Sequence, residues 1–132
     1  MKVLIVEDDF TSRKLMQSFL DPHAECDVAV NGNEAVAAFL TALDAQAPYD
    51  LICMDIMMPE MDGQEALKAI RSIEKDRGLR GPKEVKVVMT TALDDPKNVI
   101  EAYYKGGATS YLPKPIDRQL FIHLLRNLGL VK

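Results

Sequence analysis

Five short apolar runs along the chain are each followed by a segment whose apolar residues recur at helical spacing. The runs around residues 3–6, 51–54 and 87–89 are continuously apolar, which is typical of strands covered on both faces. The pattern predicts strands at residues 2–6, 26–30, 50–54, 85–90 and 110–112. This alternation predicts right-handed crossovers and a parallel sheet with helices on both faces.

The segments after the runs predict five helices, because their apolar residues are spaced by three and four. The fourth, around Val99, Ile100 and Tyr103, has the weakest stripe. Asp62 with Glu65 forms a capping box, and Asp95 before a proline gives a second helix start. The clearest stripes are Leu15, Met16, Phe19 and Leu20; Ala35, Val36, Phe39, Leu40 and Leu43; Leu67, Ile70 and Ile73; and Leu120, Phe121, Leu124, Leu125 and Leu128.

Polar residues follow the carboxyl ends of four predicted strands, which is where parallel sheets of this kind bind ligands. Each has an ordinary explanation when taken alone, since Asp9 could cap a helix and Lys114 could be a solvated charge. These separate explanations do not account for the whole set, because the clustered carboxylates of Asp8, Asp9 and Asp55 repel one another unless a cation neutralises them. Oxygen ligands without a nearby His or Cys indicate Mg²⁺. The residues at these ends are Glu7, Asp8 and Asp9; Asp55, followed by Met57; Thr91; and Lys114.

Several motifs occur in the order and spacing of one protein family. The chain resembles the response-regulator receiver family, and within it the single-domain, CheY-like members, over nearly its whole length. Each motif is weak alone, and the full set in this order is specific. The matching segments are Glu7-Asp8-Asp9, residues 54–63 with Asp55 and Met57, Thr91-Ala92, and Lys114-Pro115 with Tyr111.

The resemblance implies a fold and a domain organisation. We expect a doubly wound α/β fold of the flavodoxin/CheY-like type, with five parallel strands in the order 2-1-3-4-5 and five helices. Residues 1–132 would form one receiver domain, with no residues left for an output domain. It also implies a cis Lys114–Pro115 peptide bond, against the base rate for X–Pro bonds.

The resemblance also implies a role for each matching residue. Asp55 would be the nucleophile and phosphorylation site, and Lys114 would pair first with Asp55 and then with the phosphoryl oxygens. Mg²⁺ would be bound directly by Asp9, Asp55 and the carbonyl of Met57, with Asp8 assisting through water. Thr91 would hydrogen-bond the phosphoryl group, and Tyr111 would swing inward as it does so.

The implied partners are proteins. The phosphoryl donor would be a sensor histidine kinase or a phosphotransfer protein, and a downstream target would bind the face of helix 4, strand 5 and helix 5. The chain would catalyse only its own phosphorylation and dephosphorylation. Loss of the phosphoryl group would be slow, because Met57 and Leu93 flank the approach of water and neither can orient it.

Composition narrows the function classes further. A net charge of −4 and a pI near 5.1 argue against direct nucleic-acid binding. The apolar runs are too short to span a membrane, and the start of the chain does not resemble a signal peptide. We therefore expect a cytoplasmic protein with Cys26 and Cys53 as reduced thiols. They would not pair, because the implied order places strand one between their strands.

Three other functions are open to a chain of this pattern. A flavodoxin-like small-ligand module without phosphotransfer shares the fold, but Glu7-Asp8-Asp9 would repel a phosphate where that module has a phosphate-binding loop. A haloacid-dehalogenase-type phosphatase expects a second acid at the position of Met57. A DNA-binding regulator would need an output domain.

The sequence departs from the commonest family pattern in three places. Pro113 precedes Lys114, which is tolerable if strand five is an edge strand. The charged stretch at 74–84 is expected to be a solvated extension. The pair at 106–107 lengthens the turn before strand five and makes the output face around Tyr111 unusual.

Overall fold

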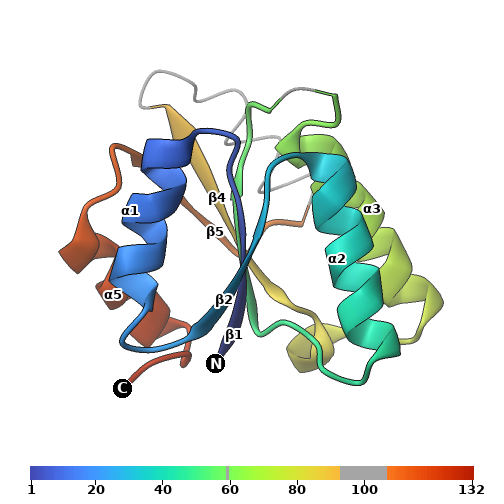
Figure 1. Cartoon of the computed structure of the whole chain (residues 1–132). Helices are drawn as coiled ribbons and strands as arrows, with labels where there is room; N and C mark the ends of the chain where they lie inside the picture. The colour runs from blue at the N-terminus through green and yellow to red at the C-terminus, as the bar shows by residue number, and fades with distance from the viewer. Residues whose placement is uncertain (59, 93–106) are drawn as a thin grey trace.

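The computed structural model describes residues 1–58, 60–92 and 107–132. A five-stranded parallel sheet in the order β2-β1-β3-β4-β5 forms the centre of the molecule (Figure 1). This is the expected doubly wound α/β architecture. The strands are β1 (Lys2–Val6), β2 (Glu25–Ala29), β3 (Leu51–Asp55), β4 (Lys86–Ala92) and β5 (Ser110–Lys114).

Helices cover both faces of this sheet. Figure 1 shows α1 and α5 on one face and α2 and α3 on the other. Their bounds are α1 (Phe10–Leu20), α2 (Gly32–Asp44), α3 (Gly63–Asp76) and α5 (Arg118–Asn127), with a short 3₁₀ helix, η1 (Gly81–Lys83), before β4. The predicted fourth helix, with its Asp95 cap, lies outside the described residues. None of the described helices has the length and apolar character that crossing a membrane requires.

Alternate residues of the central strands point into two separate cores, which explains their continuously apolar sequences. On β3, Ile52 and Met54 pack toward α2 and α3, whereas Leu51 and Cys53 pack toward α1 and α5. Phe39 and Phe121 are the largest side chains buried from the helices, one in each core. The sheet is thus anchored from both sides and holds the ends of its strands at fixed positions.

The predicted strands agree with the structure to within two residues at each end. The predicted Asp62–Glu65 capping box is present at the start of α3. Strand β5 includes Pro113 and forms an edge of the sheet, which is the condition under which proline is tolerated there. The two cysteines are free, and β1 separates β2 from β3, so the prediction that Cys26 and Cys53 do not pair is confirmed.

Two apolar positions differ from their predicted packing. Leu15 and Leu120 belong to the predicted helical stripes, yet both are exposed. Each lies next to a residue that does face the core, Met16 in α1 and Phe121 in α5. Periodicity predicts which residues share one side of a helix. It does not show how much of that side the sheet covers, so residues at its margin can be exposed.

The charged stretch at 74–84 is only partly a solvated extension, because it begins within α3, where Glu74 is 1% exposed. Its carboxylate pairs with Arg71 at 2.6 Å (Nη1 to Oε1) and accepts the Val85 N–H at 2.7 Å. Arg71 also donates to the carbonyls of Val85 and Gly107 at 2.9 and 3.0 Å. The Arg71–Glu74 pair therefore joins the end of α3 to β4 and to the segment that enters β5.

Candidate functional site

The three acidic residues after β1 differ in exposure and in the groups that they contact. Glu7 continues the strand hydrogen bonding through its N–H to Ala29, and its side chain turns inward, where it is 5% exposed. Asp8 is exposed at the same edge. Asp9 begins α1, and its carboxylate accepts the Ser12 N–H at 2.8 Å as an N-cap. Glu7 and Asp8 are therefore left to face the carboxyl end of β3.

Asp55 ends β3 and is 6% exposed. The N–H of Met57 donates to its Oδ1 at 3.3 Å. Gly63 begins α3 so close by that a Cβ there would lie 2.3 Å from the Asp55 carbonyl oxygen. Only glycine fits at this approach, and it lets the loop after Asp55 fold back tightly over the site.

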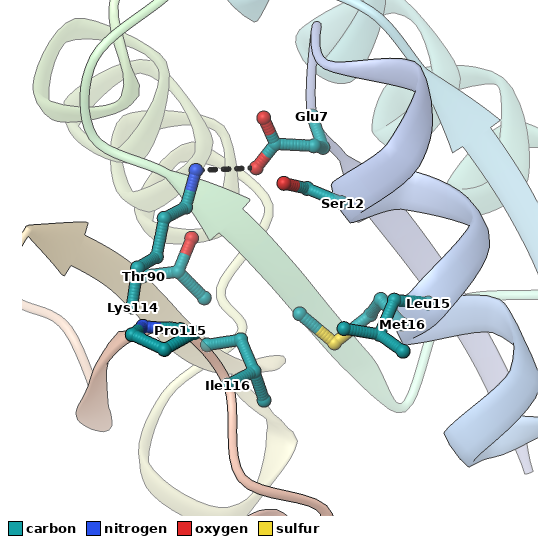
Figure 2. Close-up of a pocket in the computed structure, with 8 residues that line it drawn as sticks. All are labelled: Glu7, Ser12, Leu15, Met16, Thr90, Lys114, Pro115 and Ile116. Carbon is teal, nitrogen blue, oxygen red and sulfur yellow. Dashed lines mark hydrogen bonds and ion pairs between the residues drawn. The ribbon is translucent and has the colours of Figure 1, made fainter.

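Lys114, from the end of β5, bridges two of these acids. Its Nζ lies 2.9 Å from Glu7 Oε2 and 3.2 Å from Asp55 Oδ2. Figure 2 shows the lysine side chain reaching across the ends of the strands to the Glu7 carboxylate. The expected pairing of Lys114 with Asp55 is present, and Glu7 shares the amine. The expected cis bond between Lys114 and Pro115 is also present.

Glu7, Asp8 and Asp55 together form what we call the acidic rim. Each offers a carboxylate oxygen, and these atoms all lie within 4.8 Å of one another. The Lys114 amine contacts two of the three carboxylates, those of Glu7 and Asp55, so the group carries surplus negative charge. Clustered oxygen ligands, partly buried and with one exposed member, suit a hard divalent cation such as Mg²⁺, which keeps several of its waters.

Asp9 does not lie in this cluster, in contrast to the expectation that it binds the metal directly. Its carboxylate is used at the N-terminus of α1, where the Ser12 N–H lowers its pKa. Glu7 takes the inward position that the sequence interpretation gave to Asp9. The sequence signal is the position of Asp9 directly before the helical pattern that begins at Phe10, where aspartate is typical of an N-cap.

The charges of the site perturb one another. Burial raises the pKa of both Glu7 and Asp55, although the lysine amine opposes the rise. Burial alone would lower the pKa of Lys114, but the two carboxylates outweigh it and raise the pKa. A buried acid with a raised pKa beside a fixed cation is common at functional sites.

The remaining predicted residues lie around the rim. Thr91 is buried on β4, one residue beyond Thr90, which pairs with Asp55. Tyr111 is on β5 and is 44% exposed. Met57 follows Asp55 on the loop, and its side chain is 64% exposed. Leu93 lies outside the described residues.

A cavity of about 330 Å³ opens beside Lys114 on the α1 and α5 side of the sheet. In Figure 2, Leu15 and Met16 of α1 face Pro115 and Ile116 of the β5–α5 segment across it. Its polar margin is formed by Glu7, Ser12, Thr90 and Lys114. The sequence pattern did not indicate this cavity, because it placed Leu15 in a helical stripe without showing that this residue is exposed and borders Lys114.

Comparisons with known proteins find both similar sequences and similar structures. The family model described as the response regulator receiver domain matches residues 3–126. Among curated relatives, the hybrid signal transduction histidine kinase B of Dictyostelium discoideum is 39% identical over 87% of the chain. The chain spans 6% of that kinase, so the likeness concerns one segment of a much longer protein.

Solved structures resemble the whole chain. One belongs to the co-crystal structure of the Saccharomyces cerevisiae histidine phosphotransfer signalling protein Ypd1 and the receiver domain of Ssk1. It has a TM-score of 0.83 and 31% identity, covering 98% of this chain and 88% of that one. Another, from the CheX–CheY–BeF₃–Mg²⁺ complex of Borrelia burgdorferi, has a TM-score of 0.79 and 30% identity, covering 100% and 90%.

Proposed function

This chain belongs to the response regulator receiver domain family, and on that basis we propose that it accepts a phosphoryl group on Asp55. It is a receiver of two-component signal transduction, related to response regulators and to histidine kinases. The observation that carries the proposal is the position of Lys114. Its amine lies 3.2 Å from a buried aspartate at the edge of an acidic cluster.

We assign Mg²⁺ to the acidic rim. Asp8, Asp55 and the carbonyl of Met57 would bind the ion, and Glu7 would assist through water while it holds Lys114. The proposal departs from the sequence interpretation by leaving out Asp9, because the α1 cap already occupies its carboxylate. The bound ion supplies positive charge to an incoming phosphoryl group. The Borrelia relative in a complex with Mg²⁺ supports this choice of metal.

The transfer asks mainly for positioning and charge neutralisation. An Asp55 carboxylate oxygen forms a bond to phosphorus, and the bond from phosphorus to the donor imidazole nitrogen breaks. The imidazole keeps the electron pair of the broken bond and takes a proton from water where needed. Lys114 is already within reach and can follow the negative charge from Asp55 to the phosphoryl oxygens.

Thr91 and Tyr111 would report the phosphorylated state. Tyr111 pairs with Met89, two residues before Thr91, so the two side chains lie on the same face of the sheet. A phosphoryl group adds acceptor oxygens that call for a new donor, which the Thr91 hydroxyl can supply. Tyr111 would then turn inward. A downstream protein would read this change at the face of helix 4, β5 and α5.

The phosphoryl donor would dock over α1 and the β5–α5 segment. Leu15 of α1 is an exposed apolar residue that lines the cavity next to Lys114, and Phe10 at the start of α1 is exposed as well. An apolar surface next to a reactive group favours a protein partner that covers the site and excludes water. The relative solved with a histidine phosphotransfer protein supports a donor that is a phosphotransfer protein or a histidine kinase.

We further propose that the chain does not turn over outside substrates. Met57 occupies the position where an aspartate-based phosphatase would place its acid, and its side chain points into solvent. Glu7 and Asp55 of the acidic rim contact Lys114, and Asp8 would bind the metal, so none of the three rim acids would serve as a general acid. The flavodoxin-like alternative is disfavoured by the same rim, because three carboxylates would repel a ligand phosphate.

The test is mass spectrometry of the intact protein after incubation with acetyl phosphate and Mg²⁺. Addition of one phosphoryl group, mapped to Asp55, is the expected result. It should be absent in Asp55→Asn and in the presence of EDTA. Asp9→Asn is the matched control and should be modified like the wild type, since asparagine also caps helices. Modification that persists in Asp55→Asn would exclude this assignment.

A further inference from the structure

A second concave surface lies along α5, away from the acidic rim. This groove has a volume of about 620 Å³ and ends at the turn that follows α1. It is lined by Arg118, Gln119, Ile122, His123 and Arg126 of α5 and by His23 of the turn. The α5 members follow the three-and-four spacing of one helix face. We call it the α5 groove.

The α5 groove is positively charged, whereas the acidic rim is negatively charged. It contains two arginines and both histidines of a chain whose net charge is −4, and no acid is among its lining residues. Within the described part of the chain, Arg118, His23 and His123 make no ion pair or side-chain hydrogen bond. Arg126 donates its Nε–H to the Lys132 carbonyl and has further N–H groups to offer.

Some other arginines of this chain are already engaged. Arg71 is bound to Glu74, and Arg77 pairs with Asp44 at 2.7 Å. Exposed arginines are often simply solvated, and one alone would carry no inference. Here the cationic groups gather in a concave site whose other polar members, imidazole and amide, are also hydrogen-bond donors. Such a set is complementary to a ligand with many acceptor oxygens and negative charge.

The lining favours a small polyanion over a protein. Ile122 is the one apolar side chain among the lining residues, whereas protein interfaces depend on buried apolar or aromatic anchors. Arg118 and Arg126 are eight residues apart, which places their Cα atoms about 12 Å apart along the helix. A single phosphate is short for that span, and a chain of phosphates matches it. The volume is within the range of small-molecule sites.

We propose that the α5 groove binds a small molecule with two or more linked phosphate groups, held mainly by Arg118 and Arg126. Both a free phosphate chain and the phosphate tail of a nucleotide have this chemistry. The site is separate from Asp55 and does not depend on the function proposed above. Because α5 begins four residues after Lys114, an occupant would also contact the helix that leads out of the phosphorylation site.

The test is calorimetric titration with tripolyphosphate, ADP, pyrophosphate and orthophosphate, at neutral pH in 150 mM salt with EDTA. EDTA removes divalent ions that could attach the probes to the rim. We expect submillimolar binding of tripolyphosphate and at least tenfold weaker binding of orthophosphate. If ADP binds more tightly than pyrophosphate, the nucleoside is also recognised. If the two bind equally, the phosphate chain alone is recognised.

Variants locate the binding. Arg118→Gln/Arg126→Gln should weaken tripolyphosphate binding at least tenfold with an unchanged unfolding midpoint. The matched control, Lys75→Gln/Lys83→Gln, removes the same charge from α3 and η1 and should change affinity less than twofold. Amide NMR shifts should fall on residues 23 and 118–126. Absence of binding, equal loss in both double variants, shifts centred on Lys114, or tighter binding of an oligoglutamate peptide would overturn the proposal.

Discussion

Two buried carboxylates, Glu74 and Asp55, lie at opposite ends of the sheet and differ in how far neighbouring groups balance their charge. Both carboxylate oxygens of Glu74 have a partner within the protein. One pairs with Arg71, and the other accepts the Val85 N–H. Asp55 shares a single lysine amine with Glu7 and faces a third acid, Asp8. One site is balanced within the protein, and the other carries surplus charge.

The difference separates a structural ion pair from a functional one. A buried pair with every oxygen satisfied needs nothing further, and breaking it leaves an uncompensated charge. A cluster with surplus charge is unfavourable to folding and is explained by a ligand that balances it. Burial alone would not distinguish Glu74 from Asp55, since both are almost completely covered.

The largest effect is expected at the balanced pair. Glu74→Gln should lower the free energy of unfolding by about 2–3 kcal/mol, because Arg71 loses its counter-charge inside the protein. Urea unfolding measures the change. The exposed Glu25→Gln is the control and should stay within about 0.5 kcal/mol. Phosphorylation of Glu74→Gln by acetyl phosphate should persist under folding conditions. A variant as stable as the wild type would show that the pair is not structural.

At the rim, the sharpest comparison is between two adjacent aspartates. Asp8→Asn should weaken Mg²⁺ binding at least tenfold, about 1.4 kcal/mol, because it removes a ligand charge. Asp9→Asn should leave it unchanged, since that carboxylate caps α1. Thermal unfolding with and without Mg²⁺ reports both, because a ligand stabilises the state it binds. An equal loss of Mg²⁺ affinity in the two variants would show that Asp9 is also a metal ligand.

The surplus charge predicts a change of opposite sign to that of Glu74. Asp55→Asn, measured in EDTA, should raise the free energy of unfolding by about 1 kcal/mol. The substitution removes a buried charge, while Lys114 keeps Glu7 as its partner. Asparagine can still accept the Met57 N–H. A loss of stability as large as that of Glu74→Gln would mean that Asp55 belongs to a balanced structural pair instead.

The smallest effect concerns the lifetime of the phosphoryl group. Met57→Asn should speed its loss by a few fold, because an amide can orient the attacking water and a thioether cannot. The Met57 side chain is 64% exposed, so its shielding is partial. Decay after removal of acetyl phosphate, followed by mass spectrometry, gives the rate. Decay at the wild-type rate would show that Met57 does not limit access of water.

Much of the fold could be predicted because the central strands are covered on both faces. That burial makes runs such as Val3 to Val6 continuously apolar, and such runs are visible in any sequence. The capping box at Asp62 and the cap at Asp9 are local patterns as well. The second was also present in the sequence, but three consecutive acids left it open which of them turns inward, and the structure shows Glu7 there instead of Asp9.

Other features depend on contacts that a sequence pattern does not contain. Glu74 reads as one more charge in a polar stretch, and only the approach of Val85 and Gly107 makes a buried pair with Arg71. Leu15 reads as core and instead borders the cavity beside Lys114. In both cases, the deciding neighbour is distant in the sequence and belongs to another element.

Pro113 affects how copies of this chain can meet. The exposed edge of a sheet can take up a strand from another molecule, and proline lacks the N–H that such pairing uses. Pro113 interrupts one edge at β5, and the exposed acids Glu25 and Asp27 line the other at β2. Adding a strand would leave an acceptor unpaired at the first edge and bring like charges together at the second. Self-association through a shared sheet is thereby discouraged.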